Sequence, residues 1–172
     1  MGPCLTSAED RSPRYVCTWR SSVGHTLNAG TQMSKWVKRI LCPIDLDADS
    51  SEQLSVTLTL AQENDAAVCL LYVSATPVAD PSKPAPDWQR ELEIRLQKLG
   101  SRWFEGKVPY DAVVWSGDPA SAILGAAGEL KADLIVMATR CRGIDRLILG
   151  SVAAHVVRAS PVPVLTIRPK RF

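Results

Sequence analysis

Near the carboxyl end of the chain, residue types suited to an anion follow an apolar run. Cys141 lies between Arg140 and Arg142, and Gly150-Ser151 opens a second apolar run. A helix that begins at Gly150-Ser151 would present unpaired backbone N–H groups and the positive end of its dipole, which suits phosphate. The pattern therefore indicates a strand that leads into a helix beside a small anion.

Two further candidate positions follow earlier apolar runs. Asp45 comes directly after Pro43-Ile44, where the first run ends, and Val73 ends the second. Ligands of an open parallel sheet bind outside the carboxyl ends of its strands. An aspartate at that edge can accept hydrogen bonds from an adenine amine or a ribose hydroxyl.

Each candidate also has a purely structural explanation. Asp45 can be a turn or cap residue, and Gly150-Ser151 can be a tight turn followed by an N-cap. The arginines can be solvated, and no motif ties His25 or His155 to Cys141 as a base for a nucleophile. The sequence has no Gly-x-Ser-x-Gly, Gly-x-x-x-x-Gly-Lys-Ser/Thr, Gly-x-Gly-x-x-Gly or His-Glu-x-x-His motif. We therefore expect a protein that is not an enzyme.

The composition limits the class of protein. A chain of 172 residues is typical of one domain, and a net charge of +2 gives no reason to expect nucleic-acid binding. No apolar run approaches the roughly 20 residues that span a bilayer. The five cysteines are scattered, form no Cys-x-x-Cys pair and have only two histidines to join them. This usage favours a reducing compartment, so we expect a cytoplasmic protein with no metal and no membrane partner.

The amino-terminal part differs from the rest. Residues 1–32 mix Pro, Ser, Arg, Thr and Gly without a period of two or 3.6 and without the apolar core of a secretory signal. From Met33 onward, short apolar runs alternate with helical patterns. We expect residues 1–32 to be a disordered extension and residues 33–172 to form the folded domain.

Alternating strands and helices predict a parallel sheet. The predicted strands are residues 37–44, 67–73, 109–115, 133–138 and 163–167. Helical patterns lie between them, near residues 50–64, 88–103, 119–130 and 151–159. Five strands with four helices predict the α/β class, as an open, doubly wound, five-stranded parallel sheet.

Two helix starts carry recognisable capping residues. Ser50 and Gln53 have the spacing of a capping box, in which Ser50 is the N-cap and Gln53 is the third helical residue. In Gly117-Asp118-Pro119, the aspartate is a suitable N-cap and the proline suits the first helical position.

The ordered set of segments resembles the universal stress protein family over residues 38–168. The matching segments are Lys38-Arg-Ile-Leu-Cys-Pro-Ile-Asp45, Leu71-Tyr-Val73, Gly117-Asp-Pro119, Ala132-Asp-Leu-Ile-Val-Met-Ala-Thr139, Leu149-Gly-Ser-Val-Ala153 and Ser160-Pro-Val-Pro-Val-Leu165. The resemblance implies the adenine nucleotide alpha hydrolase-like fold, and a site for ATP or a related adenine nucleotide. It implies that Asp45 holds the adenine or ribose end, that Val73 flanks the base, and that Met137 and Ala138 line the sugar and phosphate approach. Backbone N–H groups of Gly150, Ser151 and Val152 would bind phosphate, and Pro43, Ile44 and Cys141 complete the implied site.

The chain departs from the family's phosphate loop. Many members carry Gly-x-x-Gly, nine residues, then Gly-Ser/Thr. Here Ala138 and Cys141 replace the first two glycines, and eight residues separate Cys141 from Gly150. Glycine permits positive φ and close backbone approach, whereas Cys141 adds a side chain in the phosphate path. Gly143 lies out of register for the lost glycine.

Two functions remain open. One is a stress-response module that binds an adenine nucleotide, weakly because the loop glycines are replaced. The other is a dimeric stress-response or protein-interaction domain whose nucleotide site has decayed. For either, the apolar last strand, Val162 to Ile167, is the expected homodimer surface, because an uncovered sheet edge must be shielded.

Overall fold

The computed structural model describes residues 36–77, 86–139 and 150–168. The predicted extension 1–32 and the candidate residue Cys141 lie outside these ranges. In chain order the elements are β1 (Arg39–Pro43), α1 (Ser51–Asn64), β2 (Ala67–Ser74), α2 (Asp87–Phe104), β3 (Tyr110–Ser116), α3 (Pro119–Glu129), β4 (Leu134–Ala138), α4 (Ser151–Ala159) and β5 (Val164–Ile167).

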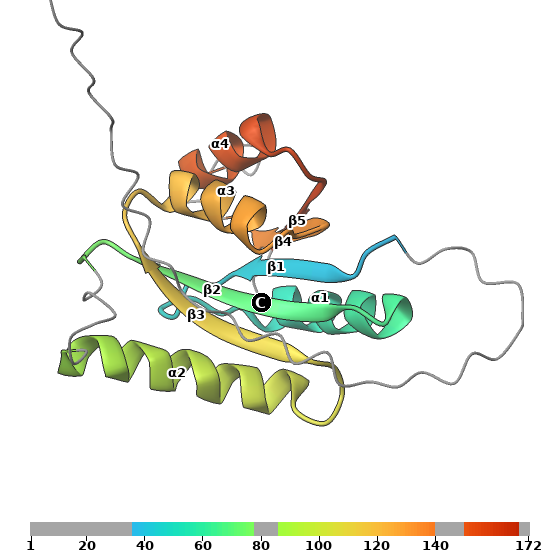
Figure 1. The fold of residues 1–172 in the computed structure, drawn as a ribbon, viewed down its shortest axis with the longest axis horizontal. Coiled ribbons are helices and arrows are strands. Elements are labelled where there is room, and N and C mark those ends of the chain that lie inside the picture. Colours follow the sequence, from blue (N-terminus) through green and yellow to red (C-terminus); the bar gives the residue numbers. More distant parts are fainter. Residues whose placement is uncertain (1–35, 78–85, 140–149, 169–172) are drawn as a thin grey trace, which may run out of the picture.

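The strands form one parallel sheet in the order β3-β2-β1-β4-β5. Helices α1 and α2 lie on one face of this sheet, and α3 and α4 lie on the other (Figure 1). The predicted doubly wound sheet of five strands and four helices is confirmed. No helix within the described ranges is long and apolar enough to cross a membrane.

The strands are apolar on both sides because both faces of the sheet are covered. In β1, Ile40 and Cys42 pack into the core under α1 and α2, whereas Leu41 packs into the core under α3 and α4. In β4, Val136 and Met137 divide between the same two cores. This two-sided burial explains why the strands are continuous apolar runs in the sequence.

The predicted start of α3 is confirmed. Asp118 is its N-cap, Pro119 is its first residue, and Oδ2 of Asp118 accepts hydrogen bonds from N and Oγ of Ser121, at 2.9 and 2.8 Å. At α4, the alternative that made Ser151 an N-cap is wrong. Gly150 occupies that position and Ser151 is the first helical residue.

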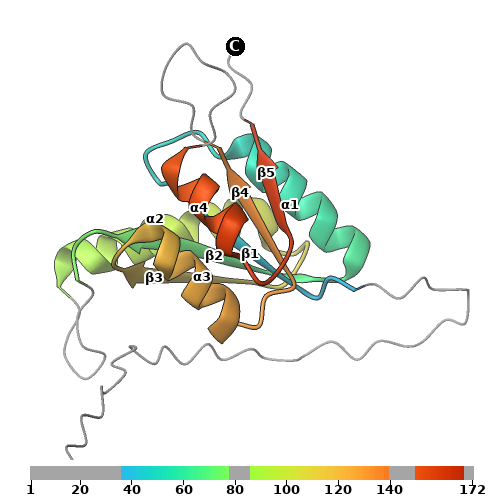
Figure 2. The same cartoon turned by 90° about the horizontal axis from the view of Figure 1, so that it is seen from above.

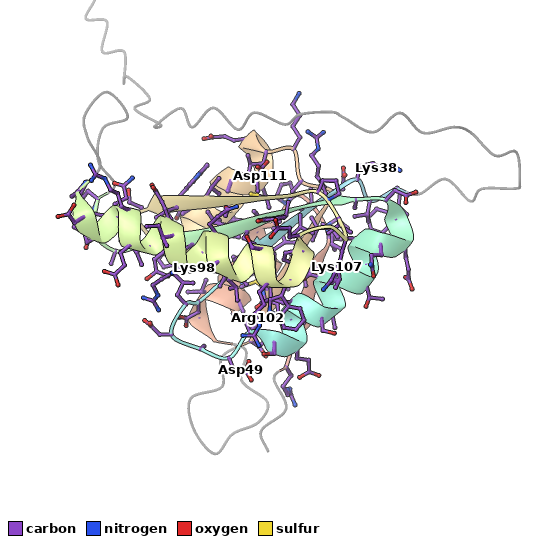
Figure 3. The ribbon with its side chains drawn as sticks, turned by 90° about the horizontal axis from the view of Figure 1, so that it is seen from below. Lys38, Asp49, Lys98, Arg102, Lys107 and Asp111 are labelled. Atoms are coloured by element: carbon purple, nitrogen blue, oxygen red, sulfur yellow. The ribbon has the colours of Figure 1, made fainter. Side chains whose placement is uncertain are left out.

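The capping box predicted for α1 is wrong. Ser50 is the N-cap residue, but its side chain makes no capping hydrogen bond. Instead Asp49, in the loop that leads into α1 (Figure 3), accepts a hydrogen bond from N of Ser51 at 2.9 Å. Two hydrogen bonds from Ser51 lower the pKa of Asp49. The one from its side chain has the larger effect, and the one from its backbone N–H the smaller. Gln53 turns into the protein, where only 2% of it is exposed.

A carboxylate fastens β4 to the start of β1. Oδ2 of Asp133 accepts from the backbone N of Lys38 at 2.8 Å and of Arg39 at 2.9 Å. N of Asp133 donates to O of Arg39 at 2.9 Å. Two main-chain donors at the amino end of β1 therefore depend on one side chain.

We expect Asp133→Ala to lower the free energy of unfolding by about 1–3 kcal/mol, because it removes the acceptor of both donors. Urea unfolding measures this change. The control is Asp87→Ala, which removes an exposed carboxylate 3.6 Å from Arg90 and should leave the midpoint unchanged. Equal midpoints for the two variants would contradict a role for Asp133 in fastening β4.

Candidate functional site

The sheet changes winding direction between β1 and β4. These two strands pair only at Ile40 with Leu134 and at Leu41 with Ile135. Beyond these pairs, β1 continues along β2 and β4 continues along β5. In open α/β sheets this is the point where ligands bind. We call it the switch edge: Pro43, Ile44 and Asp45 after β1, Met137 and Ala138 of β4, and Gly150, Ser151 and Val152 at the start of α4.

The β1 side of the switch edge is a tight turn. Ile44 is buried, and its N donates to O of Leu71 at 2.7 Å. Asp45 is half-buried, and its Oδ1 accepts from N of Asp47 at 3.0 Å, while its carbonyl accepts from N of Ala48 at 3.3 Å. Asp45 is therefore a turn residue, as the structural alternative predicted. This role holds its carboxylate at the end of β1.

A residue of α2 fastens this turn from outside. Nη2 of Arg95 donates to O of Leu46 at 3.2 Å and lies 3.4 Å from Oδ1 of Asp47. The ion pair is exposed, with 45% and 79% of the two side chains accessible, so it contributes little to stability. Its geometric effect is to join α2 to the loop that carries Asp45.

The other side of the switch edge ends in small and apolar residues. Met137 is buried and Ala138 is half-buried. The next residue, Thr139, donates to O of Ile167 from N at 2.8 Å and from Oγ1 at 3.3 Å. These bonds hold the end of β4 against β5.

Helix α4 starts at the same edge of the sheet at which β4 ends (Figure 2). Ser151 is exposed and Val152 is half-buried. The first bond of the helix runs from N of Ala154 to O of Gly150, at 2.8 Å. N–H groups before that bond have no acceptor within the helix and carry its positive dipole end. Gly150 has φ −56°, so its backbone conformation does not itself require glycine.

Of the remaining predicted site residues, the structure describes Val73. Val73 is half-buried in β2, beside β1, and its strand partner in β3 is Trp115. Cys141 falls outside the described residues. The structure thus brings Pro43, Ile44 and Asp45 to the same edge as Met137 and Ala138, with Val73 on the neighbouring strand.

The sequence interpretation missed one buried polar residue beside the switch edge. Nε2 of Gln53 donates to O of Pro43 at 2.8 Å and to O of Val136 at 2.9 Å, and lies 3.2 Å from Sγ of Cys42. Gln53, Thr57 and Ala61 are spaced four residues apart and are all buried. That spacing, rather than the capping pattern, was the signal that could have identified a buried glutamine.

Cys42 is held as a neutral thiol next to Gln53. Burial raises its pKa to about 11, although hydrogen bonds with Thr57 and Gln53 act in the opposite direction. A thiolate is the nucleophilic form of cysteine, so Cys42 is an unreactive core residue near neutral pH. Within the described ranges, no group of three His, Cys, Asp or Glu residues could hold a metal ion.

Comparison with known proteins identifies the family. The model of the universal stress protein family matches residues 37–168. The chain belongs to the universal stress protein family. A universal stress protein of Methanocaldococcus jannaschii is 34% identical over 143 residues, which cover 78% of this chain and 84% of the relative.

Solved universal stress proteins share the fold. One in complex with cAMP aligns with a TM-score of 0.60 at 23% identity, covering 78% of this chain and 98% of its own. Another, from Archaeoglobus fulgidus and in complex with dAMP, aligns with a TM-score of 0.59 at 19% identity, covering 77% of this chain and 98% of its own. The resemblance inferred from the sequence segments is confirmed.

Proposed function

We propose that this universal stress protein binds an adenine nucleotide, of the ATP type, at the switch edge. The observation that carries the proposal is that a held carboxylate, Asp45, follows β1 at the end of the sheet where α4 also begins. Related folds in complex with cAMP and dAMP support the adenine nucleoside as the ligand class.

The two sides of the switch edge differ in chemistry, which orients the ligand. Asp45 supplies oxygen acceptors for an amine or a hydroxyl, so it belongs with the nucleoside. The N–H groups of Ser151 and Val152 belong with phosphate. Ala138, the last residue of β4, adds only a methyl group at this edge. The replacement of a loop glycine by Cys141 is expected to weaken binding.

Calorimetric titration tests this function. ATP should bind more tightly than either adenosine or inorganic triphosphate alone, because only ATP reaches both sides of the switch edge. Absence of heat with all three would contradict the proposal and favour the interaction domain. That the chain is not an enzyme, and that it is cytoplasmic, stay predictions.

We propose further that two copies pair through β5. This strand lies at the edge of the sheet, and all four of its residues are half-buried. Hydrogen bonds from N of Ile135 to O of Pro163, and from N of Thr139 to O of Ile167, turn the odd-numbered residues of β5 toward β4. The backbone groups of Val164 and Thr166 then face outward, where a second copy can pair with them.

Thr166→Pro should convert the dimer into monomers, because it deletes an outward N–H and leaves the bonds to β4 intact. Sedimentation velocity measures the change. The matched control is Ala112→Pro on β3, the opposite edge. N of Val68 donates to O of Pro109, so the odd-numbered residues of β3 face β2. Ala112 therefore also turns its N–H outward, and this variant should remain dimeric. A dimeric Thr166→Pro variant would move the interface away from β5.

A further inference from the structure

Gln53 is a buried residue that contacts two strands of the sheet. It lies in the first turn of α1, is 2% exposed, and reaches back to β1 and across to β4. Its acceptors, O of Pro43 and O of Val136, lie 10 and 83 residues away in the chain. One side-chain amide therefore contacts both strands of the switch edge.

The two carbonyls lie just beyond the point where β1 and β4 stop pairing. The last pair is Leu41 with Ile135, and the next carbonyls that the strands offer at the edge are the acceptors of Gln53. A glutamine amide has two N–H donors, so it can supply one hydrogen bond to each strand. The distances of 2.8 and 2.9 Å are those of well-formed bonds.

The orientation of the amide follows from its surroundings. With the amide reversed, Oε1 would face two carbonyl oxygens, and no donor would remain for either. The carbonyl acceptors of Gln53 belong to β1 and β4, and not to the first turn of α1. The contacts of Gln53 thus serve the strands rather than the helix.

We propose that Gln53 is a positioning residue of the nucleotide site, which links β1 to β4 where the ladder between them ends. The proposal rests on the proposed function. Pro43 precedes Asp45 by two residues, and Val136 directly precedes Met137. The amide therefore fixes the distance between the nucleoside and phosphate sides of the switch edge. A site held in its binding geometry binds more tightly, since less ordering remains for the ligand to impose.

Gln53→Met tests the link because it keeps the length of the side chain and removes both donors. Titration with ATP should show a loss of affinity of roughly tenfold or more, as expected from two carbonyls that lose their partner. The matched control is Gln89→Met. Gln89 is a buried glutamine of α2, 5% exposed, whose Nε2 donates to Glu93 of the same helix at 3.0 Å. This variant should bind ATP as the wild type does.

A second readout needs no nucleotide. Cys42 and Cys69 are both buried. They lie on opposite faces of the sheet, and Cys42 touches Gln53. Labelling with N-ethylmaleimide, read by peptide mass spectrometry, should increase for Cys42 relative to Cys69 by roughly tenfold in Gln53→Met. Global destabilisation would raise the labelling of both thiols together and would count against a local link.

A measurement on the wild type covers the case in which Gln53→Met fails to fold. ATP should slow hydrogen exchange of the side-chain amide of Gln53, followed by NMR, and leave that of Gln89 unchanged. Unchanged exchange at Gln53 with ATP bound would overturn the proposal, as would unchanged ATP affinity and unchanged Cys42 labelling in Gln53→Met. If the wild type binds no ATP, the proposed function and the role of Gln53 in it are both overturned. A selective increase at Cys42 would then still establish the strand link.

Discussion

Asp45→Ala is expected to weaken ATP binding by roughly 10- to 100-fold, the cost of one lost hydrogen bond to a charged acceptor. Inorganic triphosphate should bind equally to variant and wild type, because Asp45 belongs to the nucleoside side of the site. Calorimetric titration of both ligands measures the difference. A parallel loss for both ligands would mean that the variant disturbs the whole edge rather than one contact.

Two matched variants separate the contact from the turn. Asp47→Ala removes the same charge two residues away, and it should change ATP affinity less than about threefold because its ion pair is exposed. Asp45→Asn keeps an oxygen that can accept from N of Asp47, a contact of 3.0 Å in the wild type. Full affinity in Asp45→Asn would assign the effect of alanine to the turn and contradict a role for the charge in binding.

Gly100→Ala is expected to lower the free energy of unfolding by about 1–2 kcal/mol, although alanine favours a helix by about 1 kcal/mol over glycine. A Cβ at position 100 of α2 would overlap Cε2 of Tyr110, and it would lie 2.8 Å from Cδ2 of that ring and 3.3 Å from Cδ1 of Leu70. The ring cannot swing aside freely. Its hydroxyl lies 2.9 Å from Oγ of Ser101 and 3.0 Å from Nε2 of Gln97.

The control for crowding is Gly128→Ala in α3, where an added Cβ meets no atom within 4 Å. That variant should gain up to about 1 kcal/mol from helix propensity alone. Urea unfolding of the two variants isolates the contact between α2 and β3. Equal stabilisation of both would show that Tyr110 gives way at no cost.

The fold could be predicted because its determinants are periodic and local. Apolar runs covered on both faces gave β2 and β4 within one or two residues, and the helix predicted at residues 151–159 is α4, Ser151–Ala159. The cap at Asp118 was also predictable, since its acceptor and donor lie three residues apart. Such interactions are visible in a short window of sequence.

The site was less accessible to prediction because its contacts are long-range. The carboxyl ends of β1 and β4 could be named as the edge, since topology alone places them there. Gln53 was misread as a cap because its partner Val136 lies 83 residues away. The contact of Arg95 with Leu46 spans 49 residues, so no short window of sequence could indicate it.

The most direct test of adenine-nucleotide binding is the nucleotide content of the purified wild-type protein, together with its affinity for ATP. Protein freed of nucleotide by denaturation and refolding should bind ATP at one site per chain in calorimetric titration. The supernatant of denatured protein, analysed by chromatography, should contain adenine nucleotide. An empty supernatant and no detectable ATP binding by the refolded wild type would contradict the proposed function, and they would favour a dimeric interaction domain.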